Sequence, residues 1–516
     1  MTNTTSLSTL ATHRIASGPR PVWASLTLLA ALSLSACGGG GSGDGVEITA
    51  ASSADAVQAL AQVSEEAVPV FHIAPVDISD PASVPGDADA IRTESVLPAM
   101  EDTETAGLLP EQVVSEAVEA RRQLAEHPET LHAKAASVVT VYTPAQIRAA
   151  YKLPAVTAAA TVSTAAARAA LGAGQTIYII DAFHNPNAFA DLNTYSARLN
   201  LPGCTSAAIP VTAALPLAAE NPAAGCTFSV VYAGATSGRV ATPPAYNAGW
   251  ATEIAMDVES AHAIAPLARI VLIEATSASL SALGNAITVA NNMGPGVVSM
   301  SFGALEGPWT ASADTLFQGK GMQYTASTGD SGAAVNWPAV STRVLATGGT
   351  TLTFDGGNRI ETVWAGTGGG TSAYTAVPVY QAALSRTIAR RRVADVAMDS
   401  DPYSGQYVGI TVPGRAFAFM AGGGTSIAAP EWAGMLAVAN AQRALANLPV
   451  LASVHAALYQ NVLANGNSYA QAFLDVKAGA NGSCATCAAT SGYDAASGLG
   501  TPNGTALLGF LSTIRQ

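Results

Sequence analysis

A serine near the end of the chain has the surroundings of a nucleophile. Ser426 lies in the sequence Gly-Gly-Thr-Ser-Ile-Ala-Ala-Pro at 423–430, and the apolar run from Trp432 to Leu445 predicts a buried helix after it. The small residues predict a turn that exposes the hydroxyl. Backbone N–H groups at a helix N-terminus favour negative charge that develops beside them. The alternative is an ordinary serine N-cap, so partner groups elsewhere must decide.

Two acids on one expected helix are candidates for withdrawing the proton of such a hydroxyl. Glu253 and Asp257 are four residues apart within a helix expected at 249–264, so they share a face. Two ionised carboxylates at this spacing repel, and a shared proton removes the repulsion and raises one pKa. This arrangement suits a general base that a second carboxyl group orients. A solvated acidic face is the alternative, although the neighbouring residues are mostly apolar.

No histidine has the setting that a serine nucleophile normally requires. A subtilisin-type base would stand in a His-Gly pair that opens a helix, and none of the seven histidines is followed by glycine. His262 is five residues beyond Asp257, which turns it away from the acidic face. We therefore expect His262 to cap or pack.

A third stretch, Ser-Thr-Gly-Asp-Ser-Gly-Ala at 327–333, directly follows an expected strand. Loops at the carboxyl ends of parallel strands are where α/β active sites assemble. Asp330 is then either a turn residue or an oxyanion donor, and a carboxyl group donates only when it is protonated, which favours low pH. A chymotrypsin-like interpretation of Gly-Asp-Ser-Gly fails, since the chain has no His-Cys pair and the wrong element order.

Alternating strand and helix patterns surround these stretches and must position them. Strands are expected at 175–180, 228–232, 270–273, 297–301, 323–326, 343–346 and 408–411, and helices at 249–264, 279–293 and 310–320. Thr143-Pro144-Ala145-Gln146 predicts an N-cap and a short helix to Leu153. This order predicts an α/β protein with a mostly parallel sheet covered on both faces. The sequence has no internal repeat and no transmembrane pattern after residue 37.

The ordered set of motifs resembles the sedolisins, the serine-carboxyl peptidases. The resemblance runs from Thr143 to the C-terminus and includes 143–151, 177–192, 253–274, 298–303, 348–350 and 361–372. It implies a subtilisin-like three-layer sandwich. It also implies that Ser426 is the nucleophile, Glu253 the general base and acid, Asp257 the residue that orients it, and Asp330 the oxyanion stabiliser. Phe302 and the loop at 184–186 depart from the commonest family forms.

The same resemblance implies one structural calcium ion near the C-terminus. The matching positions are Asp475, Val476, Thr490, Gly492 and Asp494. Two carboxylates and backbone carbonyls suit a hard cation. Thr490 stands where the family often has glycine, and an acidic surface turn is the alternative.

Composition predicts a large core and argues against nucleic-acid binding. Charged residues make up 11% of the 516 residues and hydrophobic ones 49%, which predicts a large core, and the net charge of −13 argues against nucleic-acid binding. Few charges also suit a protein that works in acid. We expect a monomer that acts on polypeptides.

The N-terminus has the features of an export signal. Arg14 and Arg20 precede an apolar run at 22–36 that ends in Leu-Ser-Ala before Cys37. The pattern resembles a bacterial lipoprotein signal at 1–36, with Cys37 lipidated as the one attachment to a membrane. Gly38 after the cysteine suggests outer-membrane sorting, and a secreted or cell-surface protein with a plain signal peptide is the alternative.

A change in composition near residue 140 predicts a domain boundary. We expect a tether and an acidic prosegment or spacer at 37–140, which does not match the long family prosegments, and a peptidase domain at 141–516. The four cysteines of the exported part predict two disulfides, Cys204–Cys226 and Cys484–Cys487. Metal or redox use of Cys-x-x-Cys is the alternative.

The functional expectation is an acid-active serine endopeptidase that works through an acyl-enzyme. A non-catalytic binding or adhesion protein on a peptidase scaffold is the alternative. A lipase or esterase would need Gly-x-Ser-x-Gly, and Ala428 breaks that pattern.

Overall fold

The computed structural model describes residues 52–81, 90–126, 137–156 and 164–516. The compact unit that contains them starts at Ala51. The predicted signal at 1–36, Cys37 and the Gly-rich start of the tether lie outside the described residues. Among the helices of the described residues, none combines the length and the apolar character needed to cross a bilayer.

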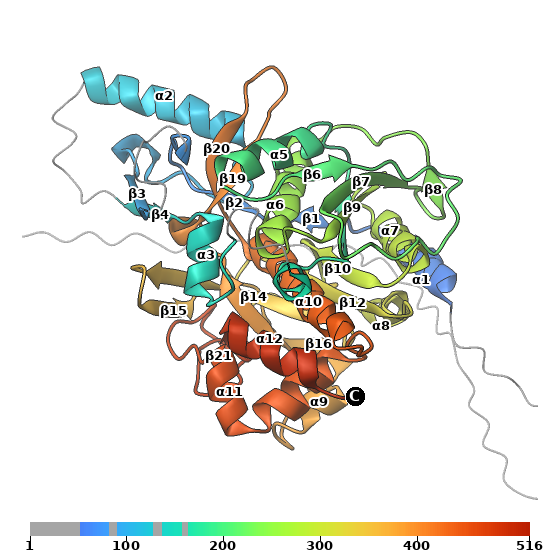
Figure 1. The fold of residues 1–516 in the computed structure, drawn as a ribbon. Coiled ribbons are helices and arrows are strands. Elements are labelled where there is room, and N and C mark those ends of the chain that lie inside the picture. The colour runs from blue at the N-terminus through green and yellow to red at the C-terminus, as the bar shows by residue number, and fades with distance from the viewer. Residues whose placement is uncertain (1–51, 82–89, 127–136, 157–163) are drawn as a thin grey trace, which may run out of the picture. The chain divides into compact units, whose positions relative to one another are not determined.

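A ten-stranded sheet forms the centre of this unit (Figure 1). Its strands follow the order β15-β14-β12-β10-β5-β9-β7-β6, with β18 beside β14 and β8 beside β7. The pairings are parallel except for β14 with β15 and β7 with β8. The strands are β5 Thr176–Ala182, β6 Cys204–Ser206, β7 Cys226–Ala233, β8 Arg239–Val240, β9 Arg269–Ala275, β10 Gly296–Met300, β12 Met322–Ser327, β14 Leu345–Phe354, β15 Arg359–Val363 and β18 Val396–Asp399.

Helices cover both faces of the sheet. Successive strand residues point to opposite sides, so a strand of apolar residues has two faces to bury. Ile177 and Ile179 of β5 pack in a hydrophobic cluster with α6 (Ala248–Ile264) and α10 (Thr425–Leu445). Tyr178 and Ile180 pack in a second cluster with α7 (Leu280–Met293). The arrangement is a three-layer α/β sandwich with a mostly parallel sheet, which confirms the predicted fold class.

Smaller elements complete the unit. The remaining helices are α1 Ser53–Leu60, α2 Pro110–Glu126, α3 Pro144–Ala150, α4 Ala165–Ala169, α5 Ala188–Arg198, α8 Thr310–Ala313, α9 Val379–Ala382, α11 Gly466–Ala472 and α12 Gly504–Thr513. The remaining strands are β1 Val68–Pro69, β2 His72–Ile73, β3 Arg92–Ser95, β4 Val138–Val141, β11 Phe302–Leu305, β13 Asn336–Trp337, β16 Gly370–Ala376, β17 Arg390–Val393, β19 Gln406–Ile410, β20 Ala418–Gly423, β21 Phe473–Leu474 and β22 Thr501–Pro502.

Three local predictions differ from the structure in informative ways. The helix expected at 310–320 ends at Ala313, and a 3₁₀ turn follows before the glycines at 319 and 321. The strand expected at 408–411 is β19, which pairs antiparallel with β20 outside the main sheet. The capping box at Thr143 is present, but its helix ends at Ala150 because Lys152 has a left-handed φ of 54°.

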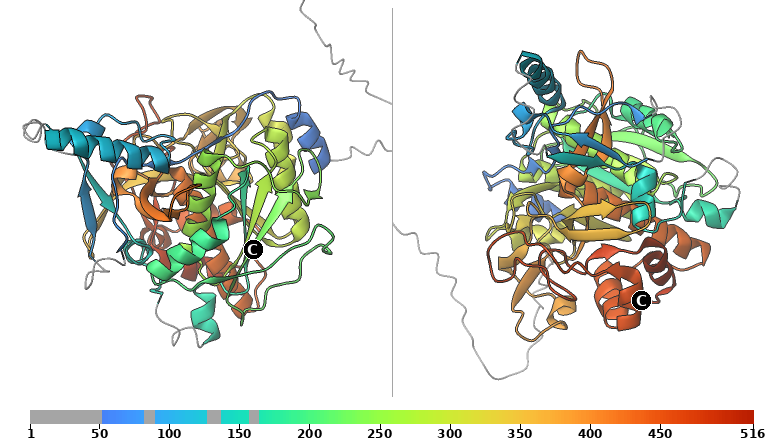
Figure 2. Two further views of the ribbon diagram at one scale, coloured as in Figure 1. Left: turned by 90° about the horizontal axis from the view of Figure 1, so that it is seen from above. Right: turned by 90° about the vertical axis from the view of Figure 1, so that its left-hand side faces the viewer.

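The described part of 52–140 contributes strands to the edges of the compact unit. β1 pairs antiparallel with β11, and β2 pairs antiparallel with β20. α1 packs against α7, whereas α2 lies on the opposite side of the unit from α1 (Figure 2). The domain boundary near residue 140 stays a prediction, and the described residues of 52–140 belong to the same compact unit as the rest.

Candidate active site

Ser426 lies at the N-terminus of α10, and small residues make the sharp entry to this helix possible. Gly424 has a φ of 102°, which favours glycine, and its N–H donates to the Ser400 carbonyl at 2.6 Å. The helix starts at Thr425, seven residues before the apolar run that predicted it. Ser426 is fully buried in the presence of the segment that covers it.

Asp330 fastens the loop after β12 to the tip of α10. Its Oδ1 accepts hydrogen bonds from the Thr425 N–H at 2.9 Å and from the Thr425 hydroxyl at 2.8 Å. The Gly329 N–H donates to the Thr425 hydroxyl oxygen at 3.1 Å. Two stretches almost a hundred residues apart in sequence therefore meet. Asp330 contacts Thr425, the residue directly before Ser426. The other oxygen of Asp330, Oδ2, lies 3.2 Å from His72 Nε2.

The two acids of α6 are buried, so the solvated acidic face is wrong. Asn247 caps the helix by accepting from the Trp250 N–H at 3.1 Å, and the whole length from Trp250 onward is covered. Glu253 and Asp257 have no exposed surface. Burial raises the pKa of both well above their ordinary values.

Asp181 is a third buried acid of this group, and the sequence analysis did not select it. It comes near the end of β5 and is fully buried. After burial, its negative charge is the largest contribution that raises the pKa of Glu253 and of Asp257. An acid at the end of an otherwise apolar strand was the available signal, since such strands end where α/β sites form.

The Ser426 hydroxyl lies close enough to the Glu253 carboxyl group to affect its pKa. This hydroxyl and the backbone of Val70 both oppose the rise in the pKa of Glu253, whereas the Asp330 charge adds to it. Neither carboxyl oxygen of Glu253 completes a hydrogen bond with the described residues. The four predicted residues, Ser426, Glu253, Asp257 and Asp330, therefore come together in one place.

Ser301 connects the acidic pair with the helix of the serine. Its hydroxyl donates to the Ser426 carbonyl oxygen at 3.2 Å. The same hydroxyl opposes the rise in the pKa of Asp257. Ser301 precedes β11, which lies beside the site, so the Ser-Met-Ser-Phe-Gly stretch links the sheet to both helices.

The Ser426 hydroxyl donates a hydrogen bond to the carbonyl oxygen of Val70. Val70 lies between β1 and β2, in an extended part of the chain that crosses the site. A peptide carbonyl therefore occupies the position next to the candidate nucleophile.

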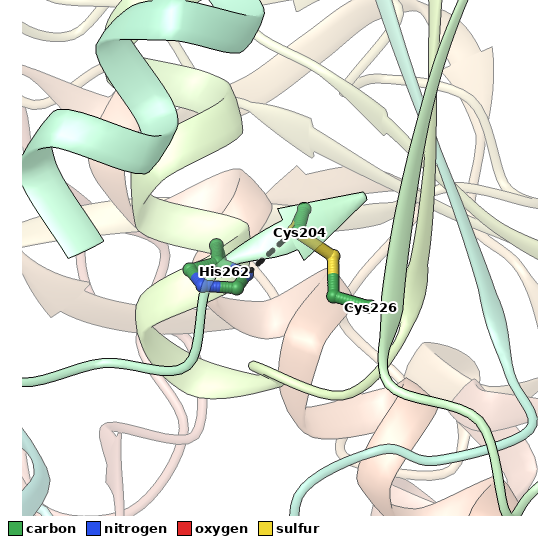
Figure 3. A group of neighbouring side chains, drawn as sticks. All are labelled: Cys204, Cys226 and His262. Atoms are coloured by element: carbon green, nitrogen blue, oxygen red, sulfur yellow. Dashed lines mark hydrogen bonds between the residues drawn. A yellow bond between two sulfur atoms is a disulfide. The ribbon is translucent and has the colours of Figure 1, made fainter. Parts of the chain in front are cut away.

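The cysteines form the two expected disulfides, Cys204–Cys226 and Cys484–Cys487. His262 lies beside the first one, with Nδ1 3.6 Å from Cys204 Sγ and Nε2 2.7 Å from the Pro202 carbonyl oxygen (Figure 3). Both sulfur atoms are in the disulfide, so they are not thiolate ligands for a metal. Burial lowers the pKa of His262 to about 4, and it packs as expected, away from the acids.

The predicted calcium residues meet in one loop. Asp475 accepts from the Gly492 N–H at 3.0 Å, and Asp494 accepts from the Thr490 N–H at 3.0 Å. Val476 and Asp494 are buried, and burial raises the pKa of Asp494. Two carboxylates thus converge on a single short turn, and the partly exposed Asp475 also lies 3.3 Å from Lys477 Nζ. Carboxylate and backbone carbonyl oxygens are the ligands that Ca²⁺ takes, so the donor set fits Ca²⁺.

Known proteins share both the sequence pattern and the architecture. A family model described as the subtilase family matches residues 246–480. Kumamolisin from Bacillus sp. (strain MN-32) is 30% identical over 292 residues, which is 50% of this chain and 50% of kumamolisin. Sedolisin from Pseudomonas sp. (strain 101) is 31% identical over 211 residues, which is 36% of this chain and 33% of sedolisin. The chain therefore spans about half the length of kumamolisin and a third of sedolisin.

A solved structure extends the similarity of the fold. Pseudomonas sedolisin, a serine-carboxyl proteinase in complex with two molecules of pseudo-iodotyrostatin, aligns with a TM-score of 0.53 at 23% identity over 72% of this chain and 98% of that one. The fold is thus that of the subtilisin-like proteins. Within that class, the chain is similar in sequence to kumamolisin over half of its length and to sedolisin over about a third of it.

Proposed function

We propose that the protein is a serine-type endopeptidase that hydrolyses peptide bonds at acidic pH. One observation carries this proposal. The Ser426 hydroxyl donates to a peptide carbonyl in an extended segment, within a group of buried carboxyl groups. A nucleophile, a base and a peptide in one enclosed place are the parts that acyl transfer needs.

Glu253 is the general base and acid of the proposed mechanism. In its ionised form it takes the proton from Ser426 Oγ as that oxygen attacks the carbonyl carbon, and it later gives the proton to the leaving amine. Asp257 and Asp181 lie next to it, and the negative charges of these acids favour the protonated forms of their neighbours. Asp257 orients Glu253, so the two share protons as a coupled set.

Asp330 stabilises the oxyanion that forms on the attacked carbonyl. Its Oδ1 is held by Thr425, which directs the carboxyl group toward the tip of α10. Only the protonated acid donates a hydrogen bond to an oxyanion, so this role requires low pH. The acyl-enzyme on Ser426 is then hydrolysed by water, which Glu253 activates in the reverse sense.

A structural calcium ion is part of the proposal. Asp475 and Asp494 would hold it with carbonyl groups of Val476, Thr490 and Gly492, and it would cross-link the loop around the Cys484–Cys487 disulfide. The proposal is supported by the position of the two carboxylates, which accept N–H groups of the same turn.

We also propose that the substrates are polypeptides and that the chain is exported as a monomer, anchored through a lipid on Cys37. Fractionation tests the anchor, because a Cys37→Ser change should move the protein from membranes to the soluble fraction. The alternative, a non-catalytic binding protein, is not favoured, since the similar Pseudomonas sedolisin is described as a serine-carboxyl proteinase.

Casein cleavage from pH 3 to 7 tests the function, with the Ser426→Ala variant beside the unchanged protein. Ser196→Ala is a matched control, because Ser196 is also fully buried but bonds only within α5. We expect acid-dependent cleavage by the unchanged protein and the control, and none by Ser426→Ala. Equal cleavage by all three, or none by any, would reject the proposal.

A further inference from the structure

A row of polar side chains crosses the main sheet at its carboxyl edge, beside the buried acids. Asp181 of β5 is the register partner of Glu274 of β9, which is in turn the partner of Tyr232 of β7. Two residues earlier on their strands, Ile179 and Leu272 pack in the hydrophobic cluster that includes α6. Asp181 and Glu274 therefore point to the side that α6 covers, and neither has exposed surface. Glu274 is thus a further buried acid, directly next to Asp181.

Glu274 differs from the other acids of this row because a cation lies on its outer side. Its Oε2 is 2.6 Å from His184 Nδ1, and its Oε1 accepts from the Asn185 N–H at 3.0 Å. The side chain of His184 is 20% exposed, so the ring reaches solvent while Glu274 stays enclosed. The hydrogen bond with Glu274 raises the pKa of His184, and burial raises the pKa of Glu274 against the opposing effect of His184. The pair is therefore ionic at about pH 6, and Glu274 is neutral at about pH 3.

The backbone fixes this pair against the helix of the acidic residues. Phe183 has a left-handed φ of 62°, which turns the chain directly after β5. The Asn185 side chain donates through Nδ2 to the Ala251 carbonyl oxygen at 3.0 Å, and Ala251 belongs to α6. The loop that carries His184 is thus bonded both to Glu274 and to α6.

The other titratable groups around the pair are two tyrosines and the buried acids. The Tyr232 ring lies edge-on to His184 with the centroids 5.7 Å apart, and Tyr246 pairs with His184 through the backbone. Burial raises the pKa of both tyrosines, so both are neutral in acid. Burial, and then the charge of Glu274, raises the pKa of Asp181. The charge of Asp181 adds to the rise that burial causes in the pKa of the two acids of α6.

The position of the negative charge within the acid group decides whether the proposed base is ready. Asp181, Glu253 and Asp257 are buried without a cation, so repulsion opposes more than one charge among them. The mechanism needs that charge on Glu253. An ionised Glu274 repels a charge on its neighbour Asp181 and leaves α6 as the favoured place. When Glu274 is neutral this preference is lost, and a charge on Asp181 keeps Glu253 protonated.

We propose that Glu274 and His184 are positioning residues for the reaction, which keep the negative charge of the acid group on Glu253 rather than on Asp181 as pH rises toward neutrality. This inference rests on the proposed function. His184 supplies the cation that keeps Glu274 ionised, and Glu274 supplies the repulsion that keeps Asp181 neutral. Neither side chain takes part in the covalent steps.

Casein hydrolysis by the full chain at pH 3 and at pH 6 tests the proposal. We expect Glu274→Gln to lower kcat about tenfold at pH 6, which corresponds to a change of about one pKa unit, and less than about twofold at pH 3, where Glu274 is already neutral. KM should stay within about twofold at both pH values, since the change affects the base and not substrate binding. A loss of equal size at the two pH values would overturn the inference.

The matched control removes another ion pair of the same strand. Arg269, at the start of β9, lies 2.7 Å from Glu220 at the opposite edge of the sheet. Glu220→Gln should change kcat less than about twofold at both pH values, because this pair is remote from the acid group. A tenfold loss in this control would mean that any broken ion pair on β9 lowers the rate, which would overturn the inference.

Two variants of His184 separate its charge from its hydrogen bond. His184→Gln keeps a donor without a charge, and His184→Lys keeps a cation. At pH 6 the first should lose about as much kcat as Glu274→Gln, and the second should retain more than about half of the kcat of the unchanged chain. Equal losses in the two variants would contradict the proposed role of the imidazolium.

Asp181→Asn provides the most specific test, because an amide fixes this side chain in its neutral form. It should retain about a third or more of kcat at pH 6, and adding Glu274→Gln to it should lower kcat less than about twofold further. A structural role for Glu274 would not depend on the residue at 181. An inactive Asp181→Asn, or a full tenfold loss in the double variant, would overturn the inference.

The outcomes also separate this inference from the proposed function. Casein hydrolysis that Glu274→Gln leaves unchanged at pH 6 overturns the positioning role and leaves the peptidase standing. Absence of hydrolysis by the unchanged chain rejects the peptidase itself.

Discussion

Two groups of buried carboxylates in this molecule have opposite surroundings. Asp395, between β17 and β18, is fully buried and accepts from Arg391 Nη1 at 2.7 Å, from the Tyr459 hydroxyl at 2.7 Å and from the Ala346 N–H at 2.9 Å. Burial alone would raise its pKa, but the Arg391 guanidinium and His455 hold the pKa of Asp395 below its ordinary value. This group is a compensated ion pair.

Glu253, Asp257 and Asp181 are buried just as completely, yet their carboxyl oxygens complete no hydrogen bond with the described residues and no cation among those residues pairs with them. Burial, and then their mutual repulsion, raises the pKa of Glu253 and Asp257. A buried acid without compensation is unfavourable for stability, and this cost supports the chemical role that we propose for Glu253 and Asp257. The two groups thus differ in the compensation of their charge rather than in burial.

The largest stability effect should come from breaking the compensated pair. Arg391→Met leaves Asp395 buried without its cation and should cost about 3–5 kcal/mol of unfolding free energy. Urea unfolding at pH 6, in the Ser426→Ala background to remove the proposed peptidase activity, measures this cost. The neighbouring exposed Arg390→Met is the control and should change stability by less than about 0.5 kcal/mol. Similar midpoints for the two variants would remove the distinction between the groups.

Asp330 should matter for rate and less for stability. Asp330→Ala should lower kcat about 10²–10³-fold, by analogy with loss of one oxyanion donor. Asp330→Asn should lose less, and its rate should depend less on acid, because an amide donates at every pH. Peptide hydrolysis from pH 3 to 7 compares the two. Identical losses in both variants would mean that Asp330 only fastens Thr425.

A third pair of carboxylates, Asp475 and Asp494, lies between the two extremes, since backbone N–H groups and the Lys477 ammonium group compensate it in part. If Ca²⁺ completes that compensation, chelation should destabilise the fold by about 2.7 kcal/mol relative to calcium at a hundredfold excess over Kd. Thermal unfolding of the Ser426→Ala protein with calcium and with EDTA measures the shift. Asp494→Asn should abolish the difference. An equal melting temperature in both buffers would leave the loop without a metal.

The two regions should also respond to pH in opposite directions. The pKa of Glu253 and of Asp257 is higher in the folded protein than in the unfolded chain. Their favourable contribution to the free energy of unfolding is therefore complete below their pKa in the unfolded chain, and it is lost as pH rises above the ordinary Glu value of 4.5. The folded pKa of Asp395 is depressed, so its contribution is lost as pH falls below the ordinary value of 3.8.

Stability should therefore decline from about pH 4.5 toward pH 8, and Glu253→Gln should decline less steeply. Urea midpoints across this range, in the Ser426→Ala background, measure the slope. The exposed Glu104→Gln is the control and should follow the unchanged slope. A parallel decline in all three proteins would show that Glu253 and its neighbouring acids do not set the pH dependence of stability.

The sequence predicted what depends on neighbours along the chain. The i, i+4 spacing of Glu253 and Asp257 sets a common helix face, and the loop after an apolar strand placed Asp330 at the carboxyl edge of the sheet. The alternation of strands and helices predicted the sandwich. These signals are local, so they can be recognised without knowledge of the tertiary structure.

The remainder depends on contacts between distant segments. Asp181 joins the acids only because β5 lies beside the strand that follows α6. The compensation of Asp395 brings together residues from 346 to 459. The crossing of 68–73 rests on two short pairings with β11 and β20 that have no periodic signature. The acidic composition of the wider region 37–140 was its visible property, and composition does not specify strand pairing.

One measurement tests most directly whether an acidic pair activates the serine hydroxyl. Glu253 and Glu259 lie on the same helix, both are buried, and burial raises the pKa of both, but Glu259 accepts from the Gly409 N–H at 2.8 Å, away from Ser426. We predict that kcat/KM for a peptide substrate at pH 4 falls about 10⁴-fold in Glu253→Gln and less than tenfold in Glu259→Gln. Retention of more than a tenth of the activity in Glu253→Gln would contradict the account.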